Sequence, residues 1–556
     1  MMKKIVCVIM SAFLLGSGTA FAQGMMDAYK FSQYDLTGTA RYLGMGGAFG
    51  ALGGDISAMG TNPAGLGIYR SSEIVTTLSL SATKANTNWA GTEMGANKTK
   101  FNFDNIAYIG YFPTGNDEGL VSWNVGFAYN RVKDFNRSYK MGRGAGGFSL
   151  SDYIAAVSNL SGLKGNNLWG TDDYNPYDSQ LWLPTLGYNA GLIDAQHPNQ
   201  QGTFYSPFGY WGENNNWEQL EVQQADMTVN EKGSINKYDF SLATNISNRF
   251  FLGATISVSD LSYQVNSSYD EDFGSAGEGI PSDHLYMDNY SKVNGTGYAF
   301  NLGVIVRPTD FLRLGVAYNS PIWYKMTNYY DAGAGAYVHG YYADNANMNP
   351  VKPGDPNLDR SATTPTDVYT DYKLRTNDRW IFSAAAILGQ YALLSVDYEL
   401  TNYKSMRLYD RDGYAAVDDN NYIKNGMKVS GMLKVGAEFK VTPQFSVRLG
   451  TALQSSPASE QLKYEGKSSD IIEVFTPGTR TMYTVDYHTN YFTGGLGYRF
   501  TPNFYVDLAY VYRMQKEDVY PFSNVINGDG DVVVEALPAT LKTNTSKFAL
   551  TLGYKF

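Results

Sequence analysis

The chain has 556 residues, of which 17% are charged and 15% aromatic, and its formal net charge is −10. An acidic surface repels the phosphates of DNA and RNA, so the charge balance argues against a nucleic-acid partner. The single cysteine is Cys7, near the N-terminus. The rest of the chain therefore has no residue for a disulfide framework, a catalytic thiol or a thiolate metal site.

The first 22 residues have the three parts of a secretory signal peptide. Lys3 and Lys4 precede an apolar stretch from Ile5 to Leu15, and Ala20-Phe21-Ala22 supplies small residues at the two positions that signal peptidase reads. A membrane-spanning helix needs about 20 apolar residues, which this stretch does not reach. We therefore expect cleavage before Gln23 and export of the remaining chain.

Residues 23–70 combine many glycines with apolar side chains. Ten glycines occur between Gly38 and Gly67, and they permit tight folding in a confined space. The apolar residues require burial, which a flexible linker would not provide. These apolar residues are Leu43, Met45, Phe49, Leu52, Ile56, Met59 and Leu66. We expect this segment to fold inside a larger structure.

The same segment carries Asp55 and the sequence Asn62-Pro63-Ala64. Pro63 fixes its own backbone angle and biases Asn62 toward an extended conformation. The Asn62 side chain can then hydrogen-bond nearby backbone groups and hold a turn. We expect Asn62 and Pro63 together to act as a latch.

From residue 71 onward, alternation of apolar and polar residues predicts fourteen strands. A mean hydropathy of −0.31 is no objection, because alternation hides a lipid-facing band from any averaged scale. An even number of strands suits a closed, antiparallel transmembrane β-barrel. The predicted strands cover residues 73–83, 102–112, 120–131, 236–246, 249–262, 296–306, 311–319, 378–387, 391–400, 428–440, 444–454, 489–500, 503–513 and 545–556.

The connections between these strands alternate between short and long. The longest spans about residues 132–235. Short turns on one side and long loops on the other are typical of bacterial outer-membrane barrels, with the turns in the periplasm. The short connections are Pro113 to Gly119, Ser247-Asn248, Arg307 to Asp310, Gly389-Gln390, Val441 to Gln444 and Thr501-Pro502. The pattern predicts an all-β barrel of the outer membrane, with the bilayer as its surroundings.

The last strand ends on an aromatic residue. Phe548, Leu550, Leu552, Tyr554 and Phe556 occupy every second position, so one face of the strand is wholly apolar. A terminal Phe after such a pattern resembles the strand by which outer-membrane barrels are recognised for assembly. Tyr554 and Phe556 are therefore the expected assembly signal, and the barrel assembly machinery is an expected partner.

The glycine-rich approach to Asp55, the Asn62-Pro63-Ala64 sequence, the strand count and the terminal Phe556 occur in this order. In this respect the chain resembles the FadL/TodX family of outer-membrane channels for long-chain fatty acids and other hydrophobic compounds. The resemblance implies an N-terminal hatch, residues 23–70, inside a barrel formed by residues 71–556. It also implies that Asp55, Asn62, Pro63 and Ala64 belong to the gating hatch, and that ligand is released sideways through the barrel wall.

The long loop is predicted to contain an amphipathic helix that starts at Ser151. Tyr153, Val157 and Leu160 would share one face of this helix, with Ile154 beside them. Trp169 and Trp182 are the first members of a group of aromatic residues farther along this loop. Together they have more apolar surface than a loop should leave in contact with water. The resemblance implies a ligand-binding groove formed by such loops. Alternatively, these residues cap the barrel and bury one another.

Several charged residues would face the lumen if the strand phases are right. Mixed signs predict pairing across the lumen and with the hatch, because charges removed from water require partners. Structural packing is the favoured interpretation, and a ligand-selecting ring is the alternative. The residues are Asp397, Glu399, Lys434, Glu438, Arg448, Arg499, Asp507, Arg513 and Lys547.

These features predict a passive, hatch-gated channel that carries hydrophobic small molecules into the cell, and not an enzyme. We expect no cofactor and no metal site, because the four histidines fall in loops without a metal-like neighbour. One alternative is a barrel of the same family that serves as scaffold or shuttle in protein secretion. Haem uptake with one of the histidines as axial ligand, and a barrel hydrolase, are further alternatives.

Overall fold

The computed structural model describes residues 24–211, 217–275, 281–339, 357–366, 368–463, 473–474, 476 and 478–556. The expected signal peptide, residues 1–22, therefore lies outside the described residues. Within the described ranges, no helix combines the length and the apolar character that crossing a bilayer requires.

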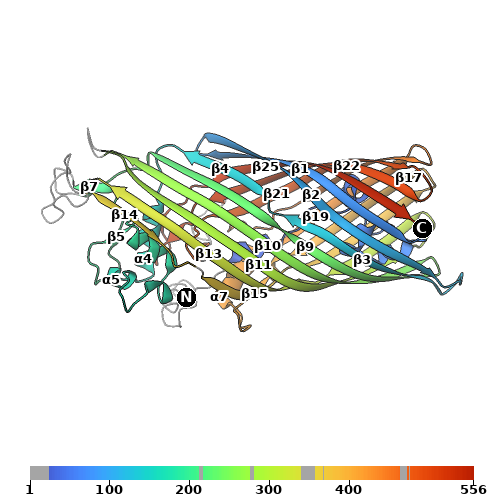
Figure 1. Cartoon of the computed structure of the whole chain (residues 1–556), viewed down its shortest axis with the longest axis horizontal. Helices are drawn as coiled ribbons and strands as arrows, with labels where there is room; N and C mark the ends of the chain where they lie inside the picture. Colours follow the sequence, from blue (N-terminus) through green and yellow to red (C-terminus); the bar gives the residue numbers. More distant parts are fainter. Residues whose placement is uncertain are drawn as a thin grey trace.

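The predicted barrel is confirmed: fourteen antiparallel strand positions close on themselves (Figure 1). The last strand pairs with the first from Glu73–Lys555 to Asn88–Thr540. In chain order the wall consists of β1 (Glu73–Trp89), β2 (Thr92–Pro113), β3 (Leu120–Asp134) with β4 (Arg137–Arg143), β9 (Gln224–Ile246), β10 (Phe250–Gly274), β11 (Asp283–Val306), β12 (Leu312–Asn319) with β13 (Trp323–Val338), β15 (Tyr369–Arg375) with β16 (Asp378–Leu388), β17 (Ala392–Asn402), β19 (Val429–Lys440), β20 (Phe445–Gln454), β21 (Tyr483–Arg499), β22 (Phe504–Tyr520) and β25 (Ala539–Lys555).

Several strands are longer than the sequence pattern predicts, always at their extracellular ends. The long connection expected between residues 83 and 102 is wrong: β1 and β2 run on as a hairpin that turns at Ala90 and Gly91, both with positive φ. Likewise, residues 132–143 and 224–235 are largely strand, so the longest connection spans residues 144–223 instead of 132–235.

The reason is that the alternation reverses where the wall leaves the membrane. Along β10 the outward-facing side chains are apolar up to Val258 and polar from Asp260 onward. The inward-facing side chains change in the opposite sense, from small or polar at Ser259 to mainly apolar from Leu261 onward. Lipid surrounds the lower part, whereas water surrounds the upper part, which needs an apolar core of its own.

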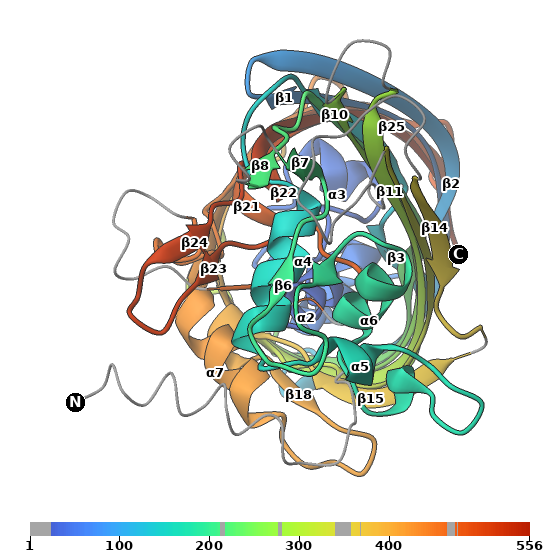
Figure 2. The same ribbon diagram turned by 90° about the vertical axis from the view of Figure 1, so that its left-hand side faces the viewer.

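The extracellular end is filled by the connection at residues 144–223 and by shorter loops. Figure 2 shows α4 and α6 lying across the mouth of the barrel. The remaining elements are α4 (Leu150–Leu160), α5 (Gly165–Leu168), η3 (Pro176–Asp178), α6 (Trp182–Asn189), β5 (Asp194–Ala195), β6 (Phe204–Tyr205), β7 (Gly209–Trp211), β8 (Trp217–Gln219), β14 (Leu358–Thr363), η4 (Tyr403–Ser405), β18 (Arg407–Tyr409), α7 (Val417–Gly426), β23 (Val525–Ile526) and β24 (Val532–Val534).

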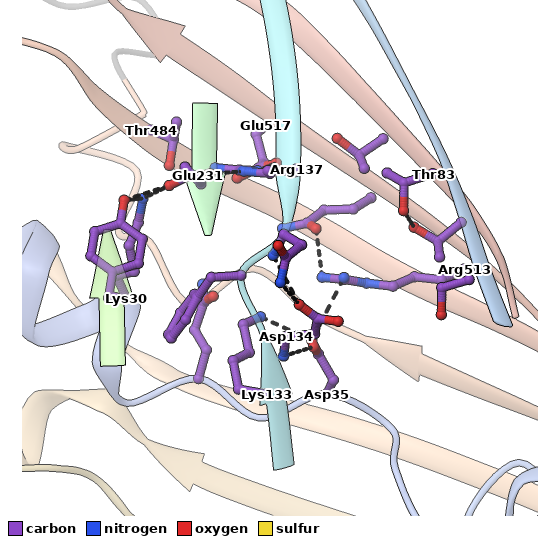
Figure 3. A pocket seen from close by; sticks show the side chains of 18 of the residues that line it. Lys30, Asp35, Thr83, Lys133, Asp134, Arg137, Glu231, Thr484, Arg513 and Glu517 are labelled. Atoms are coloured by element: carbon purple, nitrogen blue, oxygen red, sulfur yellow. Dashed lines mark hydrogen bonds and ion pairs between the residues drawn. The ribbon is translucent and has the colours of Figure 1, made fainter. Parts of the chain in front are cut away.

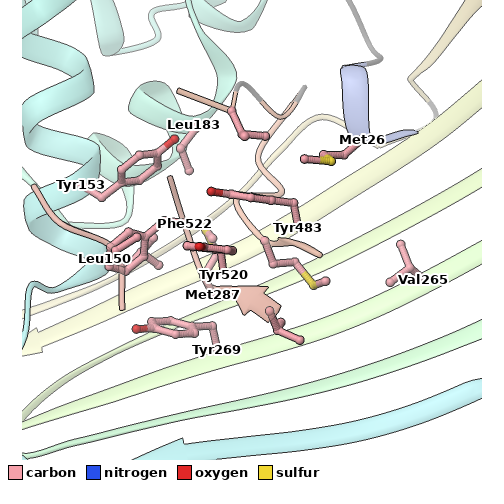
Figure 4. Close-up of a cluster of buried hydrophobic side chains, with 14 of the residues drawn as sticks. Met26, Leu150, Tyr153, Leu183, Val265, Tyr269, Met287, Tyr483, Tyr520 and Phe522 are labelled. Atoms are coloured by element: carbon pink, nitrogen blue, oxygen red, sulfur yellow. The ribbon is translucent and has the colours of Figure 1, made fainter. Parts of the chain in front are cut away.

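The predicted helix is confirmed as α4, but the cap expected at Ser151 is wrong. The helix begins at Leu150, and Ser149 forms a capping box with Asp152. Tyr153 of α4 stacks on Phe522 with ring centroids 5.3 Å apart. Figure 4 shows this packing inside the wall, so the helix belongs to the core of the extracellular end.

Residues 24–70, called the inner segment from here on, lie inside the barrel (Figure 2). The segment forms α2 (Met25–Phe31), α3 (Ala40–Gly44), η1 (Ile56–Gly60) and η2 (Pro63–Ile68). The seven apolar side chains that the sequence marks for burial are all buried, with exposed fractions of at most 2%. Burial inside the barrel thus replaces the core that so short a segment could not form alone.

Candidate functional site

The Asn62-Pro63-Ala64 sequence is held against the wall. Asn62 is buried and caps η2, because its Oδ1 accepts a hydrogen bond from Ala64 N at 3.2 Å. Its Nδ2 donates to Gly50 O at 2.6 Å and to Val304 O of β11 at 3.3 Å. One side chain therefore joins two parts of the inner segment to the barrel.

Glycines in the wall make room for this sequence. A Cβ atom on Gly253 of β10 would lie 2.2 Å from the carbonyl carbon of Pro63, and one on Gly303 of β11 would lie 1.9 Å from Asn62 Oδ1. Such separations are far below van der Waals contact, so only glycine permits the backbones to approach this closely. Further wall glycines whose Cβ would lie only 2.3 to 2.5 Å from the inner segment are Gly315, Gly436 and Gly450.

These glycines were not predicted as contact positions, although the sequence contains a signal for them. Glycine within a strand weakens it and often marks a place where another backbone comes close. Gly253, Gly303 and Gly436 all lie within predicted strands, at 249–262, 296–306 and 428–440. Inward-facing glycines in otherwise regular strands would have identified the wall positions that contact a plug.

A wall carboxylate also binds the inner segment. Asp397 of β17 accepts hydrogen bonds through Oδ2 from Phe49 N at 2.9 Å and Gly50 N at 2.8 Å. Asp55, by contrast, bonds within the segment, accepting from Ser57 N at 2.9 Å and from Thr39 Oγ1 at 2.7 Å. Asp55 therefore stabilises the fold of the segment, and Asp397 attaches it to the barrel.

The lumenal charges pair with one another and with the inner segment, as the sequence predicts. Glu438 pairs with Arg448 at 2.7 Å and with Arg41 of α3 at 2.9 Å. Arg448 also pairs with Asp507 at 2.6 Å. Further pairs are Lys434–Glu399, Arg379–Glu399, Lys547–Asp104 and Arg513–Asp35. Arg499 differs from this set because it is exposed at the periplasmic end of β21.

Above these contacts a cavity of about 140 Å³ lies between the inner segment and the wall. Figure 3 shows that Lys30, Asp35 and Lys133 point into it. Lys133 pairs with Asp35 at 2.9 Å. Nine cationic and six anionic side chains line the cavity, so its lining has an excess of positive charge. Its apolar lining includes Phe135, Tyr263, Val265, Met482 and Val511.

The wall beside this cavity lacks a continuous backbone ladder. The pairing of β2 with β3 ends at Asn105 and Asn130, whereas β2 continues upward to Thr92. After β3 the chain turns inward at Phe135, and β4 pairs with β9 only. Lys140 O of β4 accepts a hydrogen bond from Thr87 Oγ1 on the inner face of β1 at 2.5 Å. We call this discontinuity between β2 and β3–β4 the seam.

Side chains bridge the seam where backbone hydrogen bonds end. Arg131 Nη1 donates to Asn102 Oδ1 at 2.7 Å, and Lys100 pairs with Asp134 at 3.2 Å. Both partners of the Lys100–Asp134 pair are partly exposed, with fractions of 31% and 25%. An ion pair of this exposure contributes little stability, so the seam is held together less firmly than a continuous backbone ladder.

The expected ligand-binding residues of the long loop occupy different environments. Tyr153, Ile154 and Trp182 are buried, while Val157 and Leu160 are partly buried against the same core. Trp182 packs on Tyr177 and Tyr330, with ring centroids 5.0 and 4.9 Å away. Trp169 lies apart and exposes 48% of its surface, with the Arg360 guanidinium 5.7 Å above its ring.

Helix α4 is attached to β10 by a buried carboxylate. Glu271 accepts hydrogen bonds from Ser149 Oγ, from Leu150 N at 3.1 Å and from Tyr269 Oη at 2.6 Å. Burial raises the pKa of Glu271 to about 7, although these hydrogen bonds and the nearby Arg143 act in the opposite direction. The folded state therefore favours the protonated carboxyl at pH values between its ordinary pKa and about 7.

We expect α4 to loosen as the pH rises from about 4.5 to about 7. The pKa of Glu271 is higher in the folded state than its ordinary 4.5. Its contribution to the stability of the folded state is therefore complete below about pH 4.5 and is lost by about pH 7. Between these two pH values, amide exchange in α4 should accelerate by up to about tenfold per pH unit beyond the intrinsic rate, and above about pH 7 this extra acceleration should end. A Glu271→Gln variant should lack this extra acceleration, and equal pH profiles for both proteins would disprove the assignment.

The expected assembly residues lie on the outer face at the periplasmic end. Tyr554 and Phe556 expose 49% and 60% of their surfaces. The Phe556 backbone N–H donates to Ser72 O at 3.0 Å, and its ring stacks on Tyr108 at a centroid distance of 6.2 Å. In the described part of the chain, no group of three His, Cys, Asp or Glu side chains is arranged to hold a metal ion.

The chain matches the profile of the family described as outer membrane protein transport protein (OMPP1/FadL/TodX) over residues 202–556. The 47 kDa outer membrane protein of Pasteurella multocida (strain Pm70) is 20% identical over 275 residues, which are 48% of this chain and 52% of that protein. The match thus spans about half the length of that relative.

Two solved structures to which the chain is similar have low sequence identity with it. A FadL homologue of Pseudomonas aeruginosa is 16% identical with a TM-score of 0.50, and the match covers 94% of this chain and 99% of that one. The toluene transporter TodX of P. putida is 11% identical with a TM-score of 0.44, over 94% and 99% of the two chains. The first likeness establishes the fold alone.

Proposed function

Because the chain belongs to the outer membrane transport protein family OMPP1/FadL/TodX, we propose that it is a passive channel for hydrophobic small molecules, long-chain fatty acids among them. The protein resides in the outer membrane. In the proposed mechanism, ligand is captured at the extracellular end, enters the cavity above the inner segment and leaves through the seam. The inner segment acts as the hatch that closes the lumen below.

The seam is the observation that carries this proposal. The inner segment fills the lumen beneath the cavity and is bound to the wall by Asn62 and by Asp397. We infer that a ligand in the cavity leaves between β2 and β3, where side chains alone bridge the wall. This route delivers an apolar molecule to lipid instead of periplasmic water, which is the energetically favourable direction.

The cavity lining supports an amphiphile with an anionic head. Its excess of cations includes Lys98 and Lys100, which line the cavity at the seam. A carboxylate would bind such side chains by charge-assisted hydrogen bonds, and its hydrocarbon tail could lie against Phe135 and Val265. Fatty acids have this chemistry, whereas neutral hydrocarbons would leave the excess positive charge of the lining unbalanced.

A covalent bridge across the seam tests the route. We expect that Lys100→Cys and Asp134→Cys, joined by a short bifunctional thiol reagent, stop uptake of labelled oleate by cells. The same pair without reagent should transport. Because Cys7 is the only native cysteine and lies in the expected signal peptide, the reagent should find no other site.

The control pair is Thr83→Cys and Thr545→Cys, because these residues line the same cavity but lie opposite each other on paired strands. Bridging them should leave uptake unchanged. Undiminished uptake with Lys100→Cys and Asp134→Cys bridged would rule out the seam as the exit. The same strains distinguish the two alternative functions. A haem carrier would support growth on haem only while the seam is not bridged by the reagent. A secretion scaffold would leave oleate uptake at the level of cells without the protein.

A further inference from the structure

Four cations face outward on one side of the barrel. We call them the outer basic patch: Lys325 of β13, Lys373 and Arg375 of β15, and Arg407 of β18. Lys325 is exposed and the other three are half-exposed. Their neighbours along each strand point into the protein and are buried; these are Tyr324, Met326, Tyr372, Leu374 and Leu408. The strict alternation fixes all four cations on the outer surface.

The patch sets like charges directly opposite one another. Lys325 is the register partner of Lys373, and Arg375 is the partner of Arg407. Such cross-strand pairs destabilise a sheet. The ion pairs formed among the described residues include none of these four cations.

The nearby hydrogen-bond partners do not neutralise the patch. Asp371, the carboxylate on the same face of β15, accepts a hydrogen bond from Thr327 Oγ1 at 2.7 Å and keeps its negative charge, so it offsets at most one of the four positive charges. The Arg407 guanidinium donates to two backbone carbonyls at 2.7 and 2.6 Å, and that of Arg375 to Ser405 O at 3.5 Å. Uncharged carbonyl oxygens leave the positive charge of both arginines in place.

The patch lies at the level of the outer head groups. Trp323, the register partner of Arg375, exposes 46% of its surface, and Trp380 at the start of β16 exposes 44%. Exposed aromatic rings of this kind form the belt at the membrane interface. β13 and β15 lie side by side there and continue toward the extracellular end (Figure 1).

We propose that the outer basic patch binds the phosphate groups of an anionic lipid of the outer leaflet. A phosphate dianion placed among the four cations removes their repulsion, and the arginine forks match its oxygens. The acyl chains of the same lipid would lie along Trp323 and Trp380 below. This combination favours a lipid over free phosphate, which would gain nothing from the aromatic belt.

Lipid A with two phosphates is a suitable probe. The test variant is Lys325→Gln, Lys373→Gln, Arg375→Gln. The control variant, Arg249→Gln, Lys440→Gln, Arg499→Gln, removes the same charge from exposed residues at the periplasmic end. Native mass spectrometry and thermal unfolding in detergent would measure lipid binding. We expect roughly hundredfold weaker binding for the test variant and parent-like binding for the control.

Further measurements change the ligand and keep the three proteins the same. Dephosphorylated lipid A should bind all three proteins equally weakly, and inorganic phosphate should leave the melting temperature of the parent unchanged. Without lipid, the test variant should melt no lower than the parent, since its substitutions relieve repulsion. Parent-like lipid binding by the test variant, or equal binding of dephosphorylated lipid, would overturn the proposal. An equal shift with inorganic phosphate would do the same, because the ligand would then be a free anion.

Discussion

A Gly303→Val barrel should conduct ions several-fold better than the parent after reconstitution into a planar bilayer. A Cβ at this position would lie 1.9 Å from Asn62 Oδ1, so the side chain excludes Asn62 and Pro63 from their place against β11. The inner segment would then lose a wall contact that joins it to the barrel. Overpacking of this kind costs about 1 to 3 kcal/mol, which a closed barrel of this size should tolerate.

The matched control is Gly333→Val on β13. This glycine would place a Cβ 3.8 Å from its nearest neighbour, at ordinary contact distance, and the atoms within 4 Å belong to β14 and not to the inner segment. Its conductance should equal that of the parent. In cells, Gly303→Val should also raise sensitivity to large hydrophilic antibiotics. If a folded Gly303→Val barrel conducted like the parent, the seating of Asn62 and Pro63 would not be what keeps the lumen closed.

Deletion of Phe556 should sharply reduce the amount of folded barrel in the outer membrane without reducing synthesis or export. The residue exposes 60% of its surface and contacts the protein mainly through one backbone hydrogen bond and the exposed rings of Tyr108 and Tyr554. It therefore adds little to the stability of the folded barrel. Heat-modifiable mobility on a gel would measure the assembled fraction.

Two variants distinguish recognition from stability. Phe556→Tyr retains the aromatic end and should assemble like the parent. Tyr391→Ala removes an aromatic residue that is 69% exposed at a periplasmic turn, and it should also assemble normally. The few barrels that form without Phe556 should melt at the parent temperature. A normal yield of folded barrel after the deletion would show that the terminal residue is not an assembly signal.

The membrane-spanning part of the fold was predictable because lipid imposes one rule on every outward position. Leu508, Tyr510 and Phe548 face lipid as their alternation indicates, and the strand boundaries at the periplasmic turns agree with the structure. The upper halves of the strands were not predictable by the same rule, since water replaces lipid beyond Asp260 of β10 and the two faces exchange character.

The site was predictable in its parts but not in its contacts. The sequence marked Asn62 and Pro63 as a turn and the lumenal charges as paired. It could not supply the partners, because the Asn62 to Val304 contact joins residues 242 positions apart. The seam left no signal either: the inward turn at Phe135 falls in a stretch that reads as loop. The seam is recognised only from the strand pairing, because β2 continues above Asn105 without β3 as its partner.

The reversal of alternation also sets how far the protein projects from the cell. β10 continues from Asp260 to Gly274, which at about 3.3 Å per residue and a tilt of about 40° raises the mouth about 35 Å above the lipid boundary. The outer leaflet of such membranes carries hydrated saccharide chains, in which apolar compounds dissolve poorly. A mouth at this height meets its ligand within or above that layer, so the ligand crosses the saccharides inside protein. The position of one change in sequence pattern thus determines which barrier of the cell envelope the channel overcomes.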